Sequence, residues 1–331
     1  MAAPVPMVEL WRGGMLESSH LGHAVICDAQ GGIVESWGDP AAVIFPRSSC
    51  KMLQALPLVE SGAADAVGLT DAQLALACAS HQGAAIHTGM VARWLDGLGL
   101  GESDLRCGSH EPYDRAERDR LIKTDTSPCQ YHNNCSGKHS GFLTLNRHLG
   151  GHADYVEADH PVQRAVKSAF EETTAETSPG FGIDGCSAPN FATSVHGLAR
   201  AMAFFAAAPV SGSARQRAAH RLTKAMATYP ELVAGEGRSC TELMRAMGGR
   251  ATIKTGAEAV FVAIIPEKRV GIALKIVDGG TRASEAAIAA LLVRSGVLDA
   301  NHPATLKRLN AVQTNCRGFT TGIVQAAPGF P

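Results

Sequence analysis

The chain has 331 residues, a formal net charge of −1 and no long basic run, which excludes the basic patch or stripe typical of nucleic-acid-binding proteins. With 45% hydrophobic and 18% charged residues, it can bury the core of one large or two modest globular domains. None of its apolar stretches reaches membrane-spanning length, so we expect no membrane partner.

The amino-terminal segment and the cysteines both favour a reducing compartment. The segment MAAPVPMVELWRGG has no charged stretch followed by an apolar one, so we expect no signal peptide. The nine cysteines are scattered without CxxC pairs, and most of them should be buried free thiols. We therefore expect a cytoplasmic protein.

Strands are predicted for the first part of the chain. Residues 8–11 have the composition of a short strand. Residues 23–27 and 33–37 flank the turn sequence Asp28-Ala29-Gln30-Gly31-Gly32, a pattern that predicts a β-hairpin.

Ser48 and Lys51 form a Ser-x-x-Lys motif where apolar residues at helical spacing predict a buried helix. Residues three apart share a helix face, so the hydroxyl and the amine can meet. A serine needs a base beside it to act as a nucleophile, and a lysine is a base only if burial or positive charge lowers its pKa. The alternative is a serine N-cap and a solvated lysine. Pro57 should bend or end the helix.

The middle of the chain, about residues 48–245, reads as helices joined by irregular loops. Thr70-Asp71-Ala72-Gln73 has the form of a capping box, and Asp159 with Pro161 is a second helix-start signal. The long polar segment 101–141 is predicted to be a loop, and so long a loop usually marks a site. Further helices are expected near residues 86–98, 160–175, 191–207 and 214–228.

The strand pattern returns near the carboxyl end. Lys254-Thr255-Gly256 lies between an extended run at 251–253 and an apolar strand at 259–265. That strand and residues 270–277 form a second predicted hairpin, after which Thr281 should cap an Ala-rich helix over 282–293.

These elements predict an α/β (α+β) fold with one antiparallel sheet built from both chain ends. We interpret residues 1–331 as a single domain, with a sheet part at about 1–45 and 250–331 and a helical part at about 46–249. The closing helix should pack on the sheet.

The two lysine motifs together predict an acyl-transfer site. An early Ser-x-x-Lys and a late Lys-Thr-Gly on a strand are paired in penicillin-binding proteins and class A β-lactamases. Lys254 would then be a second lysine at the site of Ser48. The alternative for Lys254 is an exposed cation at the end of a strand.

Two polar runs, residues 133–141 and 183–189, each place a cysteine among small residues. Cys135 and Cys186 could bind Zn²⁺ as thiolates, but a catalytic zinc takes three protein ligands. His139, Lys138 and Asp184 are the available additions. The spacing alone leaves buried free thiols as the alternative.

The other polar candidates have plain alternatives. Ser80 lies at a predicted helix end and could be only a C-cap. Arg47 could hold a substrate carboxylate with two hydrogen bonds or be a surface arginine. The scattered histidines are expected to be loop or surface residues: His81, His87, His110 and His132.

Five motifs in order carry a family resemblance: PRSSCK, CASHQG, HNNCSGKHSG, DGCSAPNF and KTGAEAVF. They resemble the rhizobial-type L-asparaginases, class 3 or the asparaginase II family, over nearly the whole chain. The resemblance implies a fold like that of the serine β-lactamases and penicillin-binding proteins. It also implies a homodimer that hydrolyses L-asparagine to L-aspartate and ammonia.

The resemblance further implies roles for single residues. Ser48 with Lys51 and Ser80 with Lys254 form two Ser-Lys tandems, with Ser48 as the nucleophile. A zinc ion, completed by water, is held by Cys135, Lys138 and Cys186. The zinc is expected to orient the substrate rather than to generate the nucleophile. Substrate binding is assigned to Arg47, Asn133, His139 and Asp184.

Three other functions stay open on the sequence. A serine β-lactamase or D-Ala-D-Ala peptidase shares both lysine motifs, but we find no Ser-x-Asn at the expected middle position. A glutaminase also uses Ser-x-x-Lys, and one methylene in a substrate is discriminated by only about 10–200-fold. The third is a zinc-stabilised binding protein without turnover.

Overall fold

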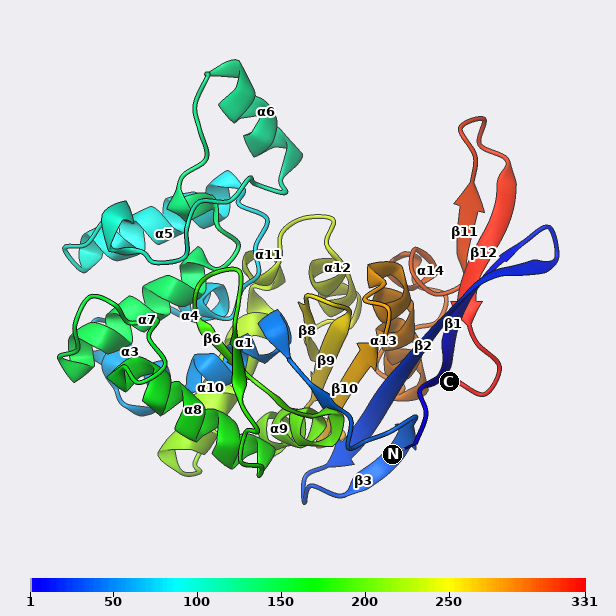
Figure 1. The fold of residues 1–331 in the computed structure, drawn as a ribbon, viewed down its shortest axis with the longest axis horizontal. Helices are drawn as coiled ribbons and strands as arrows, with labels where there is room; N and C mark the ends of the chain where they lie inside the picture. The colour runs from blue at the N-terminus through cyan, green and yellow to red at the C-terminus, as the bar shows by residue number, and fades with distance from the viewer. Residues whose placement is uncertain (1) are drawn as a thin grey trace. The chain divides into compact units, whose positions relative to one another are not determined.

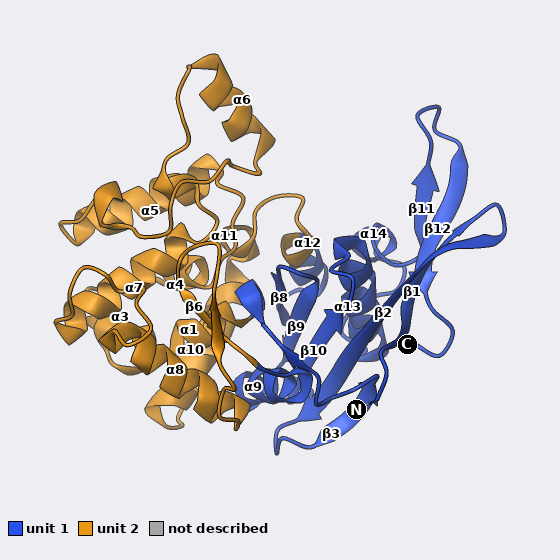
Figure 2. Cartoon of the chain, viewed as in Figure 1, with its two compact units in different colours: residues 1–49, 193–207, 242–331 blue, residues 50–192, 208–241 orange. Residues whose placement is uncertain are grey.

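An antiparallel sheet made from both ends of the chain is the centre of one of two units in the computed structural model, which describes residues 2–331. This sheet unit comprises residues 2–49, 193–207 and 242–331, drawn in blue in Figure 2. The helical unit comprises residues 50–192 and 208–241, drawn in orange.

The sheet has eight strands in residues 2–331, in the order β11-β12-β1-β2-β10-β9-β8, and β3 pairs with β2 outside this path. All neighbours are antiparallel. The predicted α+β class, with strands from both chain ends in one sheet, is confirmed (Figure 1). The strands are β1 Val5–Arg12, β2 Met15–Asp28, β3 Ile33–Trp37, β8 Thr252–Gly256, β9 Val260–Ile265, β10 Val270–Ile276, β11 Ala311–Thr314 and β12 Thr320–Ala326.

Both predicted hairpins are present. The β2–β3 turn is closed by the Asp28 carboxylate, which accepts hydrogen bonds from the backbone N–H groups of Gln30 at 2.9 Å and Gly32 at 2.8 Å. This is the turn chemistry that aspartate favours. In the β9–β10 hairpin every residue of β9 is buried, so both faces of this central strand are covered.

Helices α9 Val195–Ala207 and α13 Thr281–Arg294 pack on the sheet. The backbone of α9 approaches so closely that a Cβ on Gly271 of β10 would lie 2.1 Å from the Ala203 nitrogen. The closing Ala-rich helix on the sheet is therefore confirmed as α13. The prediction that Thr281 caps it is wrong, because the N-cap is Gly280, without a side-chain cap.

The helical unit packs around α7, Ser136–Leu149, whose residues 136–146 are all buried. Helix α7 contacts α2, α3, α4, α5 and α8. The other helices of the unit are α1 Lys51–Gln54, α2 Leu56–Glu60, α3 Ala63–Ala66, α4 Asp71–Ala77, α5 Ala85–Gly97, α6 Arg115–Lys123, α8 Pro161–Thr174, α10 Ala214–Thr228 and α11 Pro230–Val233.

Short elements complete the fold. Strands β5 Phe181–Ile183 and β6 Pro189–Phe191 pair in the helical unit, and β4 Val43–Ile44 pairs with β7 Thr193–Ser194 in the sheet unit. The remaining elements are the 3₁₀ turns η1 Arg47–Cys50, η2 Glu102–Asp104 and η3 Gln130–His132, and the helices α12 Ser239–Ala246 and α14 Pro303–Leu306.

Helix boundaries follow the sequence signals in part. Thr70 and Gln73 form the predicted capping box at the start of α4. Helix α8 begins as predicted near Pro161, but its N-cap is His160, whose side chain accepts from the Val162 N–H. The helix expected over 191–207 begins only at Val195.

Two helical predictions are wrong in detail. Ser48 lies in the 3₁₀ turn η1 rather than in an α-helix. The interruption predicted at Pro57 is present, because α1 ends at Gln54 and Pro57 lies in the first turn of the separate helix α2. The segment 101–141, predicted to be a loop, contains α6 and the start of α7. Helix α6 has a local start signal, because the Asp114 carboxylate accepts from the Glu117 N–H.

Among residues 2–331, no helix combines the length and the apolar character that crossing a bilayer requires.

Candidate functional site

Ser48 lies in the sheet unit, on a turn whose geometry is fixed by hydrogen bonds of the next residue, Ser49. Both the Ser49 hydroxyl, at 2.7 Å, and the Ser49 N–H, at 3.2 Å, donate to the Pro46 carbonyl. Arg47 has φ 54°, a left-handed value that costs a non-glycine residue about 1 kcal/mol. Ser49 is fully buried while Ser48 is only partly buried, so the turn presents Ser48 at the surface of the unit.

The Lys-Thr-Gly strand lies directly against this turn. A Cβ on Gly256 would lie 2.6 Å from the Pro46 oxygen and 3.0 Å from the Ser49 nitrogen. Lys254 and Gly256 are two apart on β8, so their side-chain positions lie on the same face of the strand. The sheet unit therefore brings Lys254, which is fully buried, to the face on which the serine turn packs.

Lys51 is buried at the start of α1 and hydrogen-bonds within the helical unit. Its Nζ donates to the Ala79 carbonyl at 2.5 Å, to Cys135 Sγ at 3.0 Å and to the Asn134 carbonyl at 3.4 Å. The structure thus joins Lys51 to two of the predicted motifs, CASHQG and HNNCSGKHSG. The Ser48–Lys51 tandem itself stays a prediction.

Ser80 is buried in the loop after α4, where its N–H donates to the Val233 carbonyl at 2.9 Å. The C-cap of α4 is Cys78. The alternative reading of Ser80 as a C-cap is therefore wrong.

Helix α7 carries Lys138 and His139. Its small residues explain why the sequence predicts a loop here rather than a helix. A Cβ on Gly137 would lie 2.4 Å from the Leu76 carbonyl oxygen of α4, and one on Gly141 would lie 3.2 Å from Leu58. The glycines of this segment allow close helix packing rather than a loop. Cys135 is the N-cap residue of α7.

Cys135, Lys138 and Cys186, the predicted zinc ligands, form a buried cluster. Lys138 Nζ lies 3.0 Å from Cys186 Sγ. A hydrogen bond from Cys135, together with the charge of Lys138, lowers the pKa of Cys186 well below its usual range. The pKa of Cys135 is raised by the same hydrogen bond. The lowered pKa favours the thiolate form of Cys186, whereas Cys135 stays a thiol that donates to Asn134 Oδ1 at 3.1 Å.

Lys138 keeps its proton in this cluster. Burial acts to lower its pKa, but the charges of Cys186 and Cys135 outweigh burial, and the pKa is raised. Lys138 and Cys186 are therefore a buried ammonium–thiolate pair. Such a pair is costly to desolvate and strongly destabilising to break.

His139 is fully buried beside this pair. Its Nδ1 lies 2.8 Å from the Tyr155 hydroxyl, and its Nε2 has no hydrogen-bond partner among the described residues. Burial lowers the pKa of His139 to about 4. The imidazole is therefore neutral at neutral pH and can act as a ligand or as a hydrogen-bonding group for substrate.

The donors of this cluster fit a zinc ion in type. Among residues 2–331, no group of three or more His, Cys, Asp or Glu side chains is arranged to hold a metal, and a zinc site made of Cys135, Lys138 and Cys186 stays a prediction. Two donors of a tetrahedral zinc lie roughly 3.6 Å apart, so the 3.0 Å between Lys138 Nζ and Cys186 Sγ would have to widen slightly. Metal binding would also displace the proton of Lys138.

Asn133 and Asp184 were predicted to bind substrate. Asn133 uses its amide within the protein: Nδ2 donates to the Cys107 carbonyl at 2.8 Å, and Oδ1 accepts from the Cys135 N–H at 2.9 Å. It therefore positions Cys135. Asp184 is partly buried and its charge acts on Lys138. Binding of substrate by either residue stays a prediction, as it does for Arg47.

The expectation of loop or surface histidines is wrong for two of the four, because His87 is buried on α5 and His132 is buried in η3, whereas His81 and His110 lie in loops. His81, His87 and His132 are buried, and the rings of His81 and His87 stack at 4.8 Å. His110 is partly exposed. The His81 ring is positioned by the Ser136 hydroxyl, 2.9 Å from Nε2.

Sequence reasoning missed two residues of the cluster. Cys50 is fully buried, its pKa is raised to about 12 by burial, and it feels the charges of Lys138 and Asp184. Its place inside PRSSCK was a usable signal. Tyr155 had none, because only the fold brings it to His139. None of the nine cysteines forms a disulfide, and seven are buried, as predicted.

The family model described as L-asparaginase II matches residues 8–326. The chain belongs to the L-asparaginase II family. Among curated protein sequences, none matches it. Membership of this family makes the chain an amidohydrolase that acts on a small-molecule substrate.

Solved structures with a similar chain trace differ widely in sequence. A β-lactamase from Mycobacterium bovis is 13% identical, with a TM-score of 0.44 over 84% of this chain and 95% of that one. The protein called Mglu, in its tris and glutamate form, is 12% identical, with a TM-score of 0.48. That match covers 91% of this chain and 64% of Mglu.

Proposed function

We propose that the protein is an L-asparaginase that hydrolyses the side-chain amide of L-asparagine to L-aspartate and ammonia (EC 3.5.1.1). The observation that carries this proposal is the packing of the Lys-Thr-Gly strand against the serine turn in a member of this family, with Gly256 allowing contact at Pro46 and Ser49. Ser48 is the nucleophile, since Ser49 is buried and bonded to Pro46.

The proposed chemistry is acyl transfer through Ser48. Lys51, three residues further along the chain, takes the hydroxyl proton, and Ser48 Oγ attacks the amide carbon of asparagine. Backbone N–H groups or donors near Ser80 stabilise the oxyanion. Ser80 or a protonated lysine gives a proton to the leaving ammonia, and water hydrolyses the resulting β-aspartyl ester. Lys254 is assigned to the second tandem with Ser80.

Zinc would be held by Cys135, Lys138 and Cys186, and it would supply a positive charge that orients the polar groups of the substrate. Two hydrogen bonds within the chain support this proposal. Asn133 Oδ1 fixes Cys135 by accepting a hydrogen bond from its N–H, and the Tyr155 hydroxyl fixes the ring of His139. Asp184, His139 and Arg47 are the proposed contacts for the charged ends of the substrate. The homodimer and the cytoplasmic location belong to the same proposal.

A glutaminase is the second candidate, because the substrates differ by one methylene and pockets discriminate such a difference weakly. The test is ammonia release from L-asparagine and L-glutamine, side by side, on purified protein with its zinc content measured. Release from asparagine with little from glutamine supports the proposal. Release from glutamine alone would reassign the substrate, and release from neither would remove the Ser48 mechanism.

Nitrocefin in the same assay tests the β-lactamase alternative, and its hydrolysis would show that the acyl group is not an asparagine side chain. Chelation tests the binding-protein alternative, which predicts unfolding without zinc and no hydrolysis of either amide. Nitrocefin hydrolysis is measured as a change of absorbance, and unfolding on chelation is measured as a change of melting temperature. The two alternatives are therefore tested separately.

A further inference from the structure

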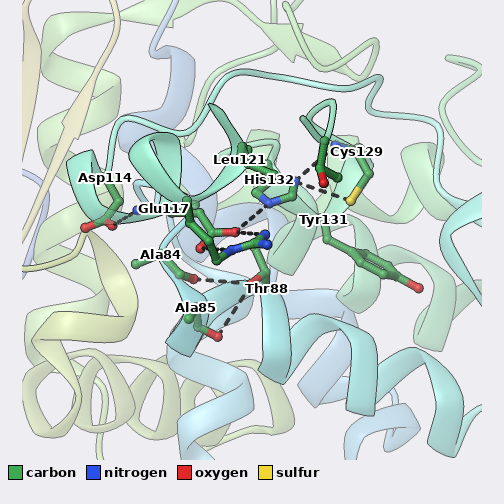
Figure 3. Close-up of polar contacts among 12 residues, drawn as sticks. Ala84, Ala85, Thr88, Asp114, Glu117, Leu121, Cys129, Tyr131 and His132 are labelled. Carbon is green, nitrogen blue, oxygen red and sulfur yellow. Dashed lines mark hydrogen bonds and ion pairs between the residues drawn. The ribbon is translucent and has the colours of Figure 1, made fainter. Parts of the chain in front are cut away.

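A second cluster of chemically active side chains lies in the helical unit, around Cys129. Cys129 precedes the 3₁₀ turn η3, which ends with His132, and Glu117 lies on α6. Cys129 Sγ is 3.3 Å from His132 Nδ1, and His132 Nε2 is 3.1 Å from Glu117 Oε1. Figure 3 shows the three side chains in line, with the imidazole between the sulfur and the carboxylate.

The hydrogen bonds define which nitrogen of His132 carries the proton. Arg120 holds the Glu117 carboxylate through two bonds, of 2.7 and 3.1 Å, and this contact, aided by His132, lowers the pKa of Glu117 despite burial. An ionised carboxylate only accepts hydrogen bonds. Nε2 of His132 therefore carries the proton, and the lone pair on Nδ1 faces Cys129.

The Nδ1 lone pair has two donors, both from Cys129. The backbone N–H of Cys129 lies 3.0 Å from Nδ1, and the thiol lies on the same side of the ring. The backbone bond fixes the ring plane, and the Glu117 bond fixes its opposite edge. A base held at both ends beside a nucleophile is the arrangement of a Cys-His-carboxylate relay.

A reagent can reach the sulfur of Cys129 more easily than the two side chains behind it. His132 and Glu117 are each 6% exposed, whereas Cys129 is only partly buried. Burial raises the pKa of the Cys129 thiol, so the sulfur is neutral at rest. Its reaction must therefore remove the proton as the sulfur attacks, and His132 Nδ1 is in place to accept it.

We propose that Cys129 is a nucleophilic thiol that exchanges with small-molecule disulfides, with His132 as the general base and Glu117 as the group that positions it. The proton of the thiol passes to His132 Nδ1, which gives up its hydrogen bond from the Cys129 N–H, and Sγ bonds to one sulfur of the disulfide. The disulfide bond breaks, and the second sulfur leaves as a thiolate that takes the proton from His132. Cys129 is oxidised to a mixed disulfide while half of the reagent is reduced to a thiol.

This site shares no residue with the proposed asparaginase site, so the two proposals can fail separately. It lies on the segment that leads into α7, six residues before Cys135. A substituent on Cys129 would compete with the hydrogen bond between its own N–H and His132. Modification would therefore disturb the capping of η3.

The test compares two cysteines in the same molecule. Cys316 is exposed and serves as the reference for an unassisted surface thiol. The protein, kept otherwise intact, is incubated with bis(2-hydroxyethyl) disulfide, quenched with acid and analysed by peptide mass spectrometry. The reagent is neutral, so Glu117 and Glu102 do not repel it.

We expect Cys129 to react at least about tenfold faster than Cys316. General-base assistance contributes about 10²–10⁴-fold, and partial burial lowers the rate at Cys129 by limiting the access of the reagent. His132→Asn should reduce the rate at Cys129 to that of Cys316 or below, and Glu117→Gln should give an intermediate rate. Labelling of Cys78, which is fully buried, reports any unfolding of a variant.

Two results would overturn the proposal. One is a wild-type Cys129 that reacts no faster than Cys316. The other is a folded His132→Asn variant whose Cys129 rate, relative to Cys316, is unchanged. If that variant unfolds, the wild-type comparison and Glu117→Gln decide the question by themselves.

Discussion

Gly256→Ala should damage the serine turn from the strand beside it. The added Cβ would lie 2.6 Å from the Pro46 oxygen, and ordinary contact begins at 3.4 Å. The two backbones would have to separate by about 0.8 Å, because neither can rotate away as a flexible side chain would. Overpacking of this kind costs about 1–3 kcal/mol. A shift near 1 Å at reacting groups reduces turnover by about 100-fold.

The assay is ammonia release from L-asparagine, with stability measured by urea unfolding. We expect kcat to fall by about 10- to 100-fold and the free energy of unfolding to fall by about 1–3 kcal/mol. Gly97→Ala is the matched control, because nothing lies within 4 Å of its added Cβ. A folded Gly256→Ala variant with wild-type kcat would refute the idea that β8 positions Ser48.

Two further predictions address the buried polar groups. Cys186→Ser should lose bound zinc on dialysis while Cys27→Ser, equally buried in β2, keeps it; equal zinc content by elemental analysis would remove Cys186 from the metal site. Glu117→Gln should lower the free energy of unfolding by about 1–3 kcal/mol at pH 7. The pKa of Glu117 is lowered in the folded state from 4.5, so its stabilisation is complete above that value and is lost as pH falls through the folded pKa. The difference between wild type and Glu117→Gln, followed by urea unfolding from pH 7 to 3, should therefore shrink below pH 4.5; a difference independent of pH would show that the carboxylate charge is not used.

The elements predicted correctly are those whose signals are local. The capping box of Thr70 and Gln73 and the turn after Asp28 both act within four residues. The return of strands after residue 250 was visible as alternating and apolar runs. Such signals act before any tertiary contact forms, so one sequence is enough to read them.

Helix α7 shows why other elements could not be predicted from the sequence. Its Ser and Gly residues are typical of loops, yet Gly137 and Gly141 are needed because α4 and α2 come so close. Tertiary packing outweighs helix propensity at such positions. The same limit applies to the site. The motifs contain the cysteines, but the contact of Tyr155 with His139 and the opposite pKa shifts of Cys135 and Cys186 depend on the fold.

The central claim is that Ser48, and not its neighbour, forms the acyl-enzyme. The direct test is asparagine turnover by Ser48→Ala and Ser49→Ala, with zinc content measured for both. Ser49→Ala loses a buried hydrogen bond to Pro46 and should lose about 1 kcal/mol of stability but keep its turnover. Ser48→Ala should be folded, retain zinc and release no ammonia above background. Full activity in Ser48→Ala would contradict the account and transfer the nucleophile to another group.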